Sequence, residues 1–216
     1  MLVLAIDTSS PAVTAAVVTA EGEVVASRTE IAPRGHGELL APFIAECLDT
    51  AAVGPSDIGA VVAGVGPGPY TGLRVGLVSA AAFAAARGIP TYGVCSLDAI
   101  GAACPDDANL LVVTDARRRE VYWARYRHGK RHDGPHVDHP ADVALAGAVA
   151  LAGAGVDLHD WPGLEIRAAR YPDPASLVGL AADRLSSGAD SEVLTPLYLR
   201  RPDAVVPGAP KAVSQR

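Results

Sequence analysis

Leu2-Val-Leu-Ala-Ile-Asp7 is a short apolar run that stops at an aspartate and is followed by Thr8-Ser-Ser-Pro11. This pattern is typical of a buried β-strand that ends in a turn. The same unit returns in the second half of the chain as Leu110-Leu-Val-Val-Thr-Asp115, with a polar turn and the alternating segment Glu120-Val-Tyr-Trp-Ala-Arg-Tyr126 behind it. We interpret the two units as an internal repeat, which predicts a protein of two similar halves.

Strands and helices alternate around these units, which predicts an α/β fold. Further strands are expected at 12–19, 23–31, 59–65, 89–94 and 109–114, and helices at 36–49, 73–87, 96–104 and from Pro174, with Asp173 as its cap, to Gly188. Pro42 lies inside the first helix, so that helix is expected to begin near Leu39 or to bend. Glycines and prolines over 127–140 predict a loop or a frayed hairpin.

Composition excludes several classes of protein. Half of the 216 residues are hydrophobic, but no apolar run approaches the roughly 18 to 20 residues of a membrane span. The first residues carry no basic stretch ahead of their apolar run, so we expect no signal peptide. Cys47, Cys95 and Cys104 are an odd number of cysteines without paired spacing. They favour a reducing, cytoplasmic setting over a disulfide frame or a zinc site.

The charges are distributed unevenly. Residues 1–108 carry 4 basic and 11 acidic side chains, whereas 109–216 carry 14 and 13. Because phosphate contact needs a cationic surface, we expect no non-specific binding of nucleic acid. Any contact with RNA would be local or made by a partner. Two interpretations stay open for Arg117-Arg-Arg119, a solvated hairpin turn or a contact with tRNA phosphates.

Two interpretations also remain open for Asp7, Thr8 and Ser9. Carboxylates and hydroxyls at a strand end can hold a metal-bound water and receive phosphate, as in two-lobed ATPases, or they can form a turn without any ligand. Such ATPases have a glycine two residues after the aspartate, where this chain has Ser9 and, in the repeat, Arg117. The loop Gly66-Pro-Gly-Pro-Tyr-Thr-Gly72 lacks the lysine of a P-loop and has two prolines, which favours a rigid connection.

The helix after this loop has a small residue at every fourth position. These positions are Gly72, Gly76, Ala80, Ala84 and Gly88. Such a stripe permits close approach of another helix, and a helix that is apolar nearly all round must be covered on more than one side. The residues alone leave open whether the cover is the chain's own core or another protein.

No catalytic centre stands out. His128, His132, His136 and His139 have spacings that would suit a metal on a helix, but the glycines and prolines among them exclude that helix. No grouping of Ser, His and Asp or of Cys and His indicates a nucleophile. We therefore expect neither catalytic residues nor a metal site.

Six stretches, in order along the chain, resemble the TsaB (YeaZ) family, partner subunits of the bacterial tRNA threonylcarbamoyladenosine machinery. They are Leu4–Ser9, His36–Leu40, Gly66–Gly76, Ser96–Ala99, Asp115–Tyr122 and Pro196–Ala204. The resemblance implies an actin-like (ASKHA, ribonuclease H-like) α/β fold of two lobes, each with a mixed sheet and flanking helices. It places an N-terminal lobe at 1–104 and a C-terminal lobe at 105–204. The residues themselves, with Pro207-Gly-Ala-Pro210 after Val205, predict a disordered tail at 205–216.

The resemblance also implies a function. TsaB-like proteins pair with the catalytic paralogue TsaD, which transfers a threonylcarbamoyl group to N6 of A37 in tRNAs that read A-starting codons, and a TsaE-like ATPase completes the assembly. TsaD carries an HxxxH metal motif where this chain has His36 and Leu40. We therefore expect an accessory subunit, not an enzyme, that activates a TsaD-like transferase and contacts tRNA only through it. No membrane and no required cofactor are expected, and ADP or ATP is allowed at the partner interface, next to Asp7, Thr8 and Ser9.

TsaB-like proteins self-associate through two helices of the N-terminal lobe, and TsaD uses the same face. The interface residues that this resemblance implies are His36, Leu39, Leu40, Phe43, Cys47, Tyr70, Thr71, Leu73, Arg74, Gly76, Leu77, Ala80 and Ala84. A charged residue at Gly76 or Ala80 is then expected to abolish both homodimer and heterodimer while the monomer stays folded. Two alternatives remain: an autonomous ATPase or sugar kinase of this fold, and a glycoprotease-like peptidase.

Overall fold

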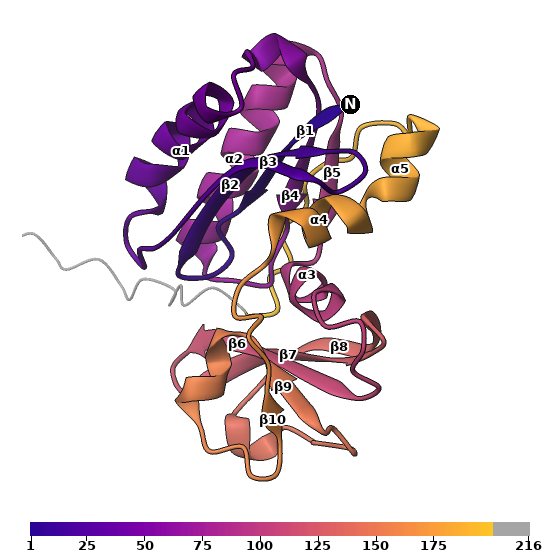
Figure 1. The fold of residues 1–216 in the computed structure, drawn as a ribbon. Helices are drawn as coiled ribbons and strands as arrows, with labels where there is room; N and C mark the ends of the chain where they lie inside the picture. Colours follow the sequence, from indigo (N-terminus) through magenta and orange to yellow (C-terminus); the bar gives the residue numbers. More distant parts are fainter. Residues whose placement is uncertain (201–216) are drawn as a thin grey trace, which may run out of the picture.

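The computed structural model describes residues 1–200, which form two lobes, each built on a five-stranded sheet (Figure 1). The strand order is β3-β2-β1-β4-β5 in the first sheet and β8-β7-β6-β9-β10 in the second, so the two sheets have the same topology. In each, three antiparallel strands are extended by two parallel ones. This confirms the α/β class and the predicted repeat. The tail expected at 205–216 lies outside the described residues.

The elements have the following bounds. The first sheet contains β1 Leu2–Asp7, β2 Ala12–Thr19, β3 Val24–Ile31, β4 Ile58–Gly64 and β5 Thr91–Val94. The second contains β6 Leu110–Arg117, β7 Glu120–Arg127, β8 Lys130–Asp138, β9 Ala150–Ala152 and β10 Glu165–Ile166. The α-helices are α1 His36–Thr50, α2 Tyr70–Arg87, α3 Ser96–Ala102, α4 Pro174–Leu180 and α5 Ala182–Ser187. Short 3-10 helices cover Pro55–Asp57, Pro140–Asp142 and Ala154–Leu158.

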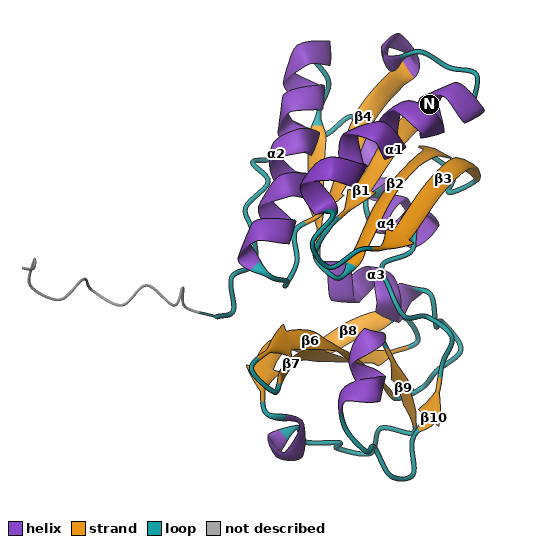
Figure 2. Ribbon diagram, turned by 90° about the vertical axis from the view of Figure 1, so that its left-hand side faces the viewer, coloured by secondary structure: helices purple, strands orange, loops and turns teal. Residues whose placement is uncertain are grey.

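The first sheet is covered on both faces. Helices α1 and α2 lie over one face (Figure 2), where Leu4 and Ile6 of β1 join their core. Helix α4 lies on the other face, where Leu177 packs in one cluster with Val3 and Ala5. Because β1 and β4 are buried on both faces, their sequences are continuous apolar runs without alternation. No helix within residues 1–200 is long and apolar enough to cross a membrane.

Helix α1 begins at His36, as the predicted range 36–49 has it and not at the alternative start near Leu39, and it continues through Pro42. Pro42 is exposed, so the carbonyl that loses its helical partner there can bond to water. Helix α2 begins at Tyr70, three residues before the predicted start, and ends as predicted at Gly88, whose φ of +65° is left-handed.

The loop predicted at 127–140 is mostly strand β8. It pairs antiparallel with β7, with register shifts on either side of Arg125, so the alternative of an irregular hairpin is confirmed. Gly134 explains the irregularity. Its φ is +92°, and a Cβ there would lie 2.9 Å from the Trp123 carbonyl oxygen, so only glycine lets the two strands approach this closely.

The last helices return to the first lobe. The helix predicted from Pro174 to Gly188 is divided at Ala181, and Asp173 caps it as expected by accepting a hydrogen bond from Ser176 N at 2.8 Å. Both α4 and α5 contribute to the core of the first sheet, through Leu177 and Leu185 among others. The boundary expected at 104/105 therefore separates the two sheets but not the helices that follow the second sheet.

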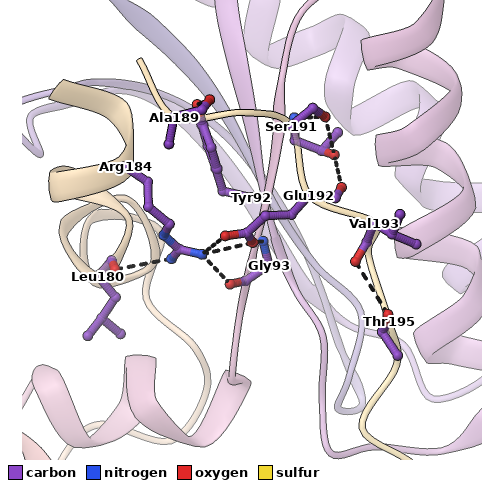
Figure 3. A network of polar contacts seen from close by, with 10 residues as sticks. Tyr92, Gly93, Leu180, Arg184, Ala189, Ser191, Glu192, Val193 and Thr195 are labelled. Atoms are coloured by element: carbon purple, nitrogen blue, oxygen red, sulfur yellow. Dashed lines mark hydrogen bonds and ion pairs between the residues drawn. The ribbon is translucent and has the colours of Figure 1, made fainter. Parts of the chain in front are cut away.

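Residues 189–200, here called the C-terminal strap, run from α5 past β5 to α2. Glu192 N donates to Thr91 O at 2.8 Å, so the strap pairs with the edge strand of the first sheet. Figure 3 shows how Glu192 holds it: its carboxylate accepts from Gly93 N at 3.0 Å and from Arg184 Nη1 at 2.9 Å. Burial acts to raise the pKa of Glu192, but these bonds outweigh it and the pKa lies below its ordinary value.

Candidate functional site

The carboxylate at the end of β1 is enclosed by the protein. Asp7 Oδ2 accepts from Ser96 Oγ at 2.6 Å, and Oδ1 accepts from Ser9 N at 2.9 Å and Ser9 Oγ at 2.8 Å. A Cβ at Gly64 would lie 1.8 Å from Oδ2, so β4 passes directly against it. Burial raises the pKa of Asp7, and the bonds from Ser96 and Ser9 oppose that rise.

Thr8 and Ser9 are equally enclosed, by the glycine-rich loop and by α2. Thr8 Oγ1 donates to Gly72 O at 2.7 Å and accepts from Gly76 N at 3.0 Å. A Cβ at Gly68 would lie 2.1 Å from Ser9 O, so the loop rests on the turn after β1. The structure thus brings the predicted nucleotide-binding residues together, but it buries them and engages their side chains in internal hydrogen bonds. These contacts agree with the interpretation of 66–72 as a rigid loop. The residues at the end of β1 connect this strand to α2.

The small-residue stripe of α2 faces inward. A Cβ at Gly76 would lie 2.3 Å from Thr8 Oγ1, and Ala80 and Ala84 are buried in the core of the first sheet. The stripe therefore allows α2 to approach the chain's own β1 turn and sheet. A charge at Gly76 or Ala80 would enter that core, so the expectation that such a monomer stays folded is wrong.

Most of the predicted interface residues lie on the sides of the two helices that pack against the chain's own core. Those buried in the chain's own core are Leu40, Phe43, Cys47, Leu73, Gly76, Leu77, Ala80 and Ala84. His36 and Leu39 are half-buried, and Tyr70, Thr71 and Arg74 are exposed. The last five offer the most surface to another molecule.

The surface that α1 and α2 turn away from the sheet consists mainly of small side chains, although α1 also exposes Glu38, Glu46 and Asp49. We call it the outer face and define it by its exposed residues Ala41, Pro42 and Ala45 of α1 and Thr71, Arg74, Val78, Ala81, Ala82 and Ala85 of α2. Val78 is 66% exposed. Between Arg74 and Arg87, α2 carries no charged residue. The sequence did not identify Val78, Ala81, Ala82 or Ala85 as surface residues of an interface. They lie on α2 outside the small-residue stripe.

An aromatic platform stands at the first turn of α2. The rings of Tyr70 and Tyr198 stack with centroids 5.2 Å apart, and the Arg74 guanidinium lies 3.9 Å from the Tyr70 centroid. Arg74 Nε also donates to Tyr198 Oη at 2.8 Å. The strap thus brings Tyr198 to the edge of the outer face from 124 positions along the chain. All three side chains are of types that dominate the binding energy of protein interfaces.

The aspartate of the repeat has a different environment. Asp115 Oδ1 accepts from Arg117 N at 2.6 Å, and the side chains of the two residues pair at 3.2 Å, but neither residue is buried. Arg117, Arg118 and Arg119 all have positive φ and lie exposed at the tip of the hairpin. The predicted polar turn is confirmed, and the enclosure seen at Asp7 has no counterpart here.

The histidines do not gather around one point. His136 Nε2 contacts Asp133 Oδ1 at 2.9 Å, and His139 Nδ1 contacts Arg119 O at 3.2 Å. Within the described part of the chain, no group of three or more His, Cys, Asp or Glu side chains is placed to hold a metal ion.

Comparison with known proteins assigns the family. The model of the family "TsaD: tRNA N6-adenosine threonylcarbamoyltransferase" matches residues 19–197. The tRNA threonylcarbamoyladenosine biosynthesis protein TsaB of Escherichia coli is 32% identical over 93% of this chain and 95% of its own length. This chain belongs to the TsaB (YeaZ) family. An uncharacterized protein of Mycobacterium tuberculosis is more similar, with 51% identity over 94% of this chain and 93% of its own.

A solved structure extends the family likeness to the fold. YeaZ from Pseudomonas aeruginosa superposes with a TM-score of 0.77 at 27% identity, covering 92% of this chain and all of its own. The two lobes with mixed sheets and flanking helices are therefore the actin-like fold that the resemblance to the TsaB family implied.

Proposed function

We propose that this protein is a non-catalytic partner subunit that binds a TsaD-like transferase and supports threonylcarbamoylation of N6 of A37 in tRNAs that read A-starting codons. Family membership supports the pathway, since the E. coli and Bacillus subtilis relatives are named for tRNA threonylcarbamoyladenosine biosynthesis. A tRNA-modification role also fits the cytoplasm as the place of action.

The observation that carries the proposal is the outer face. Exposed apolar residues that gather on two neighbouring helices are a mark of a protein interaction site. Apart from Thr71 and Arg74, the residues of the outer face are alanines, a proline and one valine, so a facing helix can approach closely. The Tyr70, Arg74 and Tyr198 platform at its edge supplies the larger anchors that a specific interface needs.

The same face accounts for two modes of association. Without its partner, a second copy would lay its own α1 and α2 on the outer face, because a two-fold dimer buries the same patch of both subunits. The TsaD-like partner would then compete for this surface, and the homodimer would dissociate as the heterodimer forms. A TsaE-like ATPase would join the heterodimer.

Two features of the first lobe support an accessory role. Asp7, Thr8 and Ser9 are buried and their side chains bond to their neighbours, so a phosphate or a metal-bound water would have to compete with these bonds. Leu40 stands where the HxxxH motif of a TsaD-like enzyme would have its second histidine, and its side chain is packed in the core. In our proposal the partner supplies the chemistry and the contact with tRNA, and no cofactor is required by this chain.

Reconstitution tests the proposal. The TsaD-like and TsaE-like proteins of the same organism would be incubated with threonylcarbamoyl-adenylate and an unmodified tRNA, with and without this chain, and modified A37 quantified by mass spectrometry. We expect modification only when the chain is present. Equal modification without it would contradict the proposal, as would ATP turnover or chelator-sensitive peptide cleavage by the chain alone.

A further inference from the structure

A pocket of about 460 Å³ opens at the ends of α1 and α2 and reaches across to the second lobe. We call it the cross-lobe pocket. Its lining residues are Ser10, Pro11, Pro33, Arg34, His36, Gly37, Pro69, Tyr70, Thr71, Gly72, Val75 and Arg117. It adjoins the outer face, because Tyr70, Thr71 and Val75 belong to α2 and His36 begins α1.

The lining of the cross-lobe pocket contains two arginines, one from each half of the chain. Its lining includes Arg34, His36 and Arg117 and no aspartate or glutamate. Residues 1–108 contain only four basic residues in all, and Arg34 is one of them. The first turn of α2 also opens into the pocket, and its N–H groups favour negative charge. An anionic group is the complement of this lining.

The two arginines are available to an incoming group. Arg34 is exposed at the rim. Arg117 pairs with Asp115 at 3.2 Å, but more than half of its side chain stays exposed. His36 Nε2 donates to Ser10 O at 2.8 Å, since a carbonyl oxygen only accepts, and this fixes the ring against the pocket wall. Three proline rings, Pro11, Pro33 and Pro69, stiffen the remaining walls.

Resting on the proposed function, we propose that the cross-lobe pocket receives an acidic side chain of the protein that docks on the outer face. Charge complementarity selects a carboxylate, and the planar guanidinium groups bind carboxylates in a two-pronged geometry. The arginines stand at the rim, where they meet a group carried by a docked surface. Because Arg34 comes from the first lobe and Arg117 from the second, the carboxylate joins both lobes to the partner.

Charge reversal tests the proposal. Affinity for the TsaD-like partner would be measured by isothermal titration calorimetry at low and at high salt for Arg34→Glu and Arg117→Glu. Arg127→Glu, an exposed change at the end of β7, is the matched control. We expect each pocket variant to bind at least about tenfold more weakly, with a reduced salt dependence, while the control binds like the wild type. Unchanged thermal unfolding would show that the variants are folded.

The outcomes separate this inference from the proposed function. If the wild-type chain does not bind the partner, the proposed function fails. If it binds and both reversals bind equally well, the pocket does not take a partner carboxylate, although the proposed function stands. Binding of inorganic phosphate to the free chain, together with unaffected association of both variants, would assign the pocket to a small anion and overturn the proposal.

A cross-link identifies the partner residue. The chain has only two lysines, Lys130 and Lys211, so Arg34→Lys introduces a nearly unique amine that keeps the positive charge. A carbodiimide joins a lysine amine to a carboxylate in direct contact. We expect a cross-linked peptide between position 34 and one acidic residue of the partner, and none at position 127 in Arg127→Lys. Absence of the position 34 cross-link in a complex that still forms would contradict the proposal.

Discussion

Replacing Gly76 by alanine separates the two possible tasks of the small-residue stripe. The added Cβ would lie 2.3 Å from Thr8 Oγ1 and 3.3 Å from Thr8 Cβ, and Thr8 is buried. Thr8 must therefore move, which breaks its bonds to Gly72 O and from Gly76 N. The structure predicts a loss of folding stability with no direct effect on association.

The size of the loss follows from these contacts. Each hydrogen bond contributes about 0.5–1.5 kcal/mol, overpacking of a core costs about 1–3 kcal/mol, and alanine gains about 1 kcal/mol over glycine within a helix. The net effect of Gly76→Ala is a destabilisation of about 3 kcal/mol. Gly37→Ala in α1 is the matched control, because a Cβ there has nothing within 4 Å. It is expected to be neutral or stabilising by up to about 1 kcal/mol.

A double-mutant cycle in urea completes the test. Thr8→Ala removes Oγ1, so Gly76→Ala should cost much less in that background, with a coupling energy of at least about 1 kcal/mol. Far-ultraviolet circular dichroism is the proper signal, because both tryptophans, Trp123 and Trp161, pack in the second lobe. If Gly76→Ala is as stable as the wild type but no longer associates, the stripe is an interface and our account of it is wrong.

Three further predictions concern other parts of the chain. Burial raises the pKa of Asp7 above 3.8, so the folded chain holds this proton more tightly than the unfolded chain. The wild type should therefore lose stability relative to Asp7→Asn as the pH rises through that pKa. A difference in the free energy of unfolding between the two proteins that stays constant in urea from about pH 4 to 7 would refute this. Glu192→Gln removes a partly exposed ion pair with Arg184 and should cost at most about 1 kcal/mol in the same assay, so a larger loss would mean that the strap carries more of the fold than we infer. Gly101→Ala would place a Cβ 2.4 Å from the ring of the buried Tyr126 and should destabilise the second lobe by about 1–3 kcal/mol. Tryptophan fluorescence should then show unfolding at a lower urea concentration. An unchanged urea midpoint would argue against this packing.

The repeat and most elements could be predicted because short-range patterns determine them. A doubly buried strand such as β1 is a continuous apolar run, and Asp173-Pro174 and Gly188 mark helix ends through local backbone chemistry. For the segment 127–140, which forms β8, the sequence left a loop and a frayed hairpin open, because Gly134 taken alone indicates a loop. Gly134 has its positive φ within a strand, where its missing side chain lets it pack against the Trp123 backbone of β7.

The site was harder to predict because it depends on contacts between distant residues. Periodicity identified a stripe on α2. Only the tertiary structure shows that Thr8 and the first sheet of the same chain cover it. The residues left on the outer face follow only once that side is known. Tyr198 and Arg117 reach the edge of this face from the strap and from the second lobe, and no local pattern links either one to α2.

Val78→Glu tests the central claim most directly. Val78 is 66% exposed in the middle of the outer face, so a glutamate there should leave the monomer within about 0.5 kcal/mol of the wild type. Val149→Glu, at a 56% exposed valine of the second lobe, is the control. In sedimentation with and without the TsaD-like partner, we expect the Val78 variant to stay monomeric and to bind the partner more than about 100-fold more weakly, because an interface cannot solvate the buried charge. The control should behave like the wild type. A folded Val78→Glu protein that dimerises and binds its partner as the wild type does would contradict the assignment of the outer face as the docking surface.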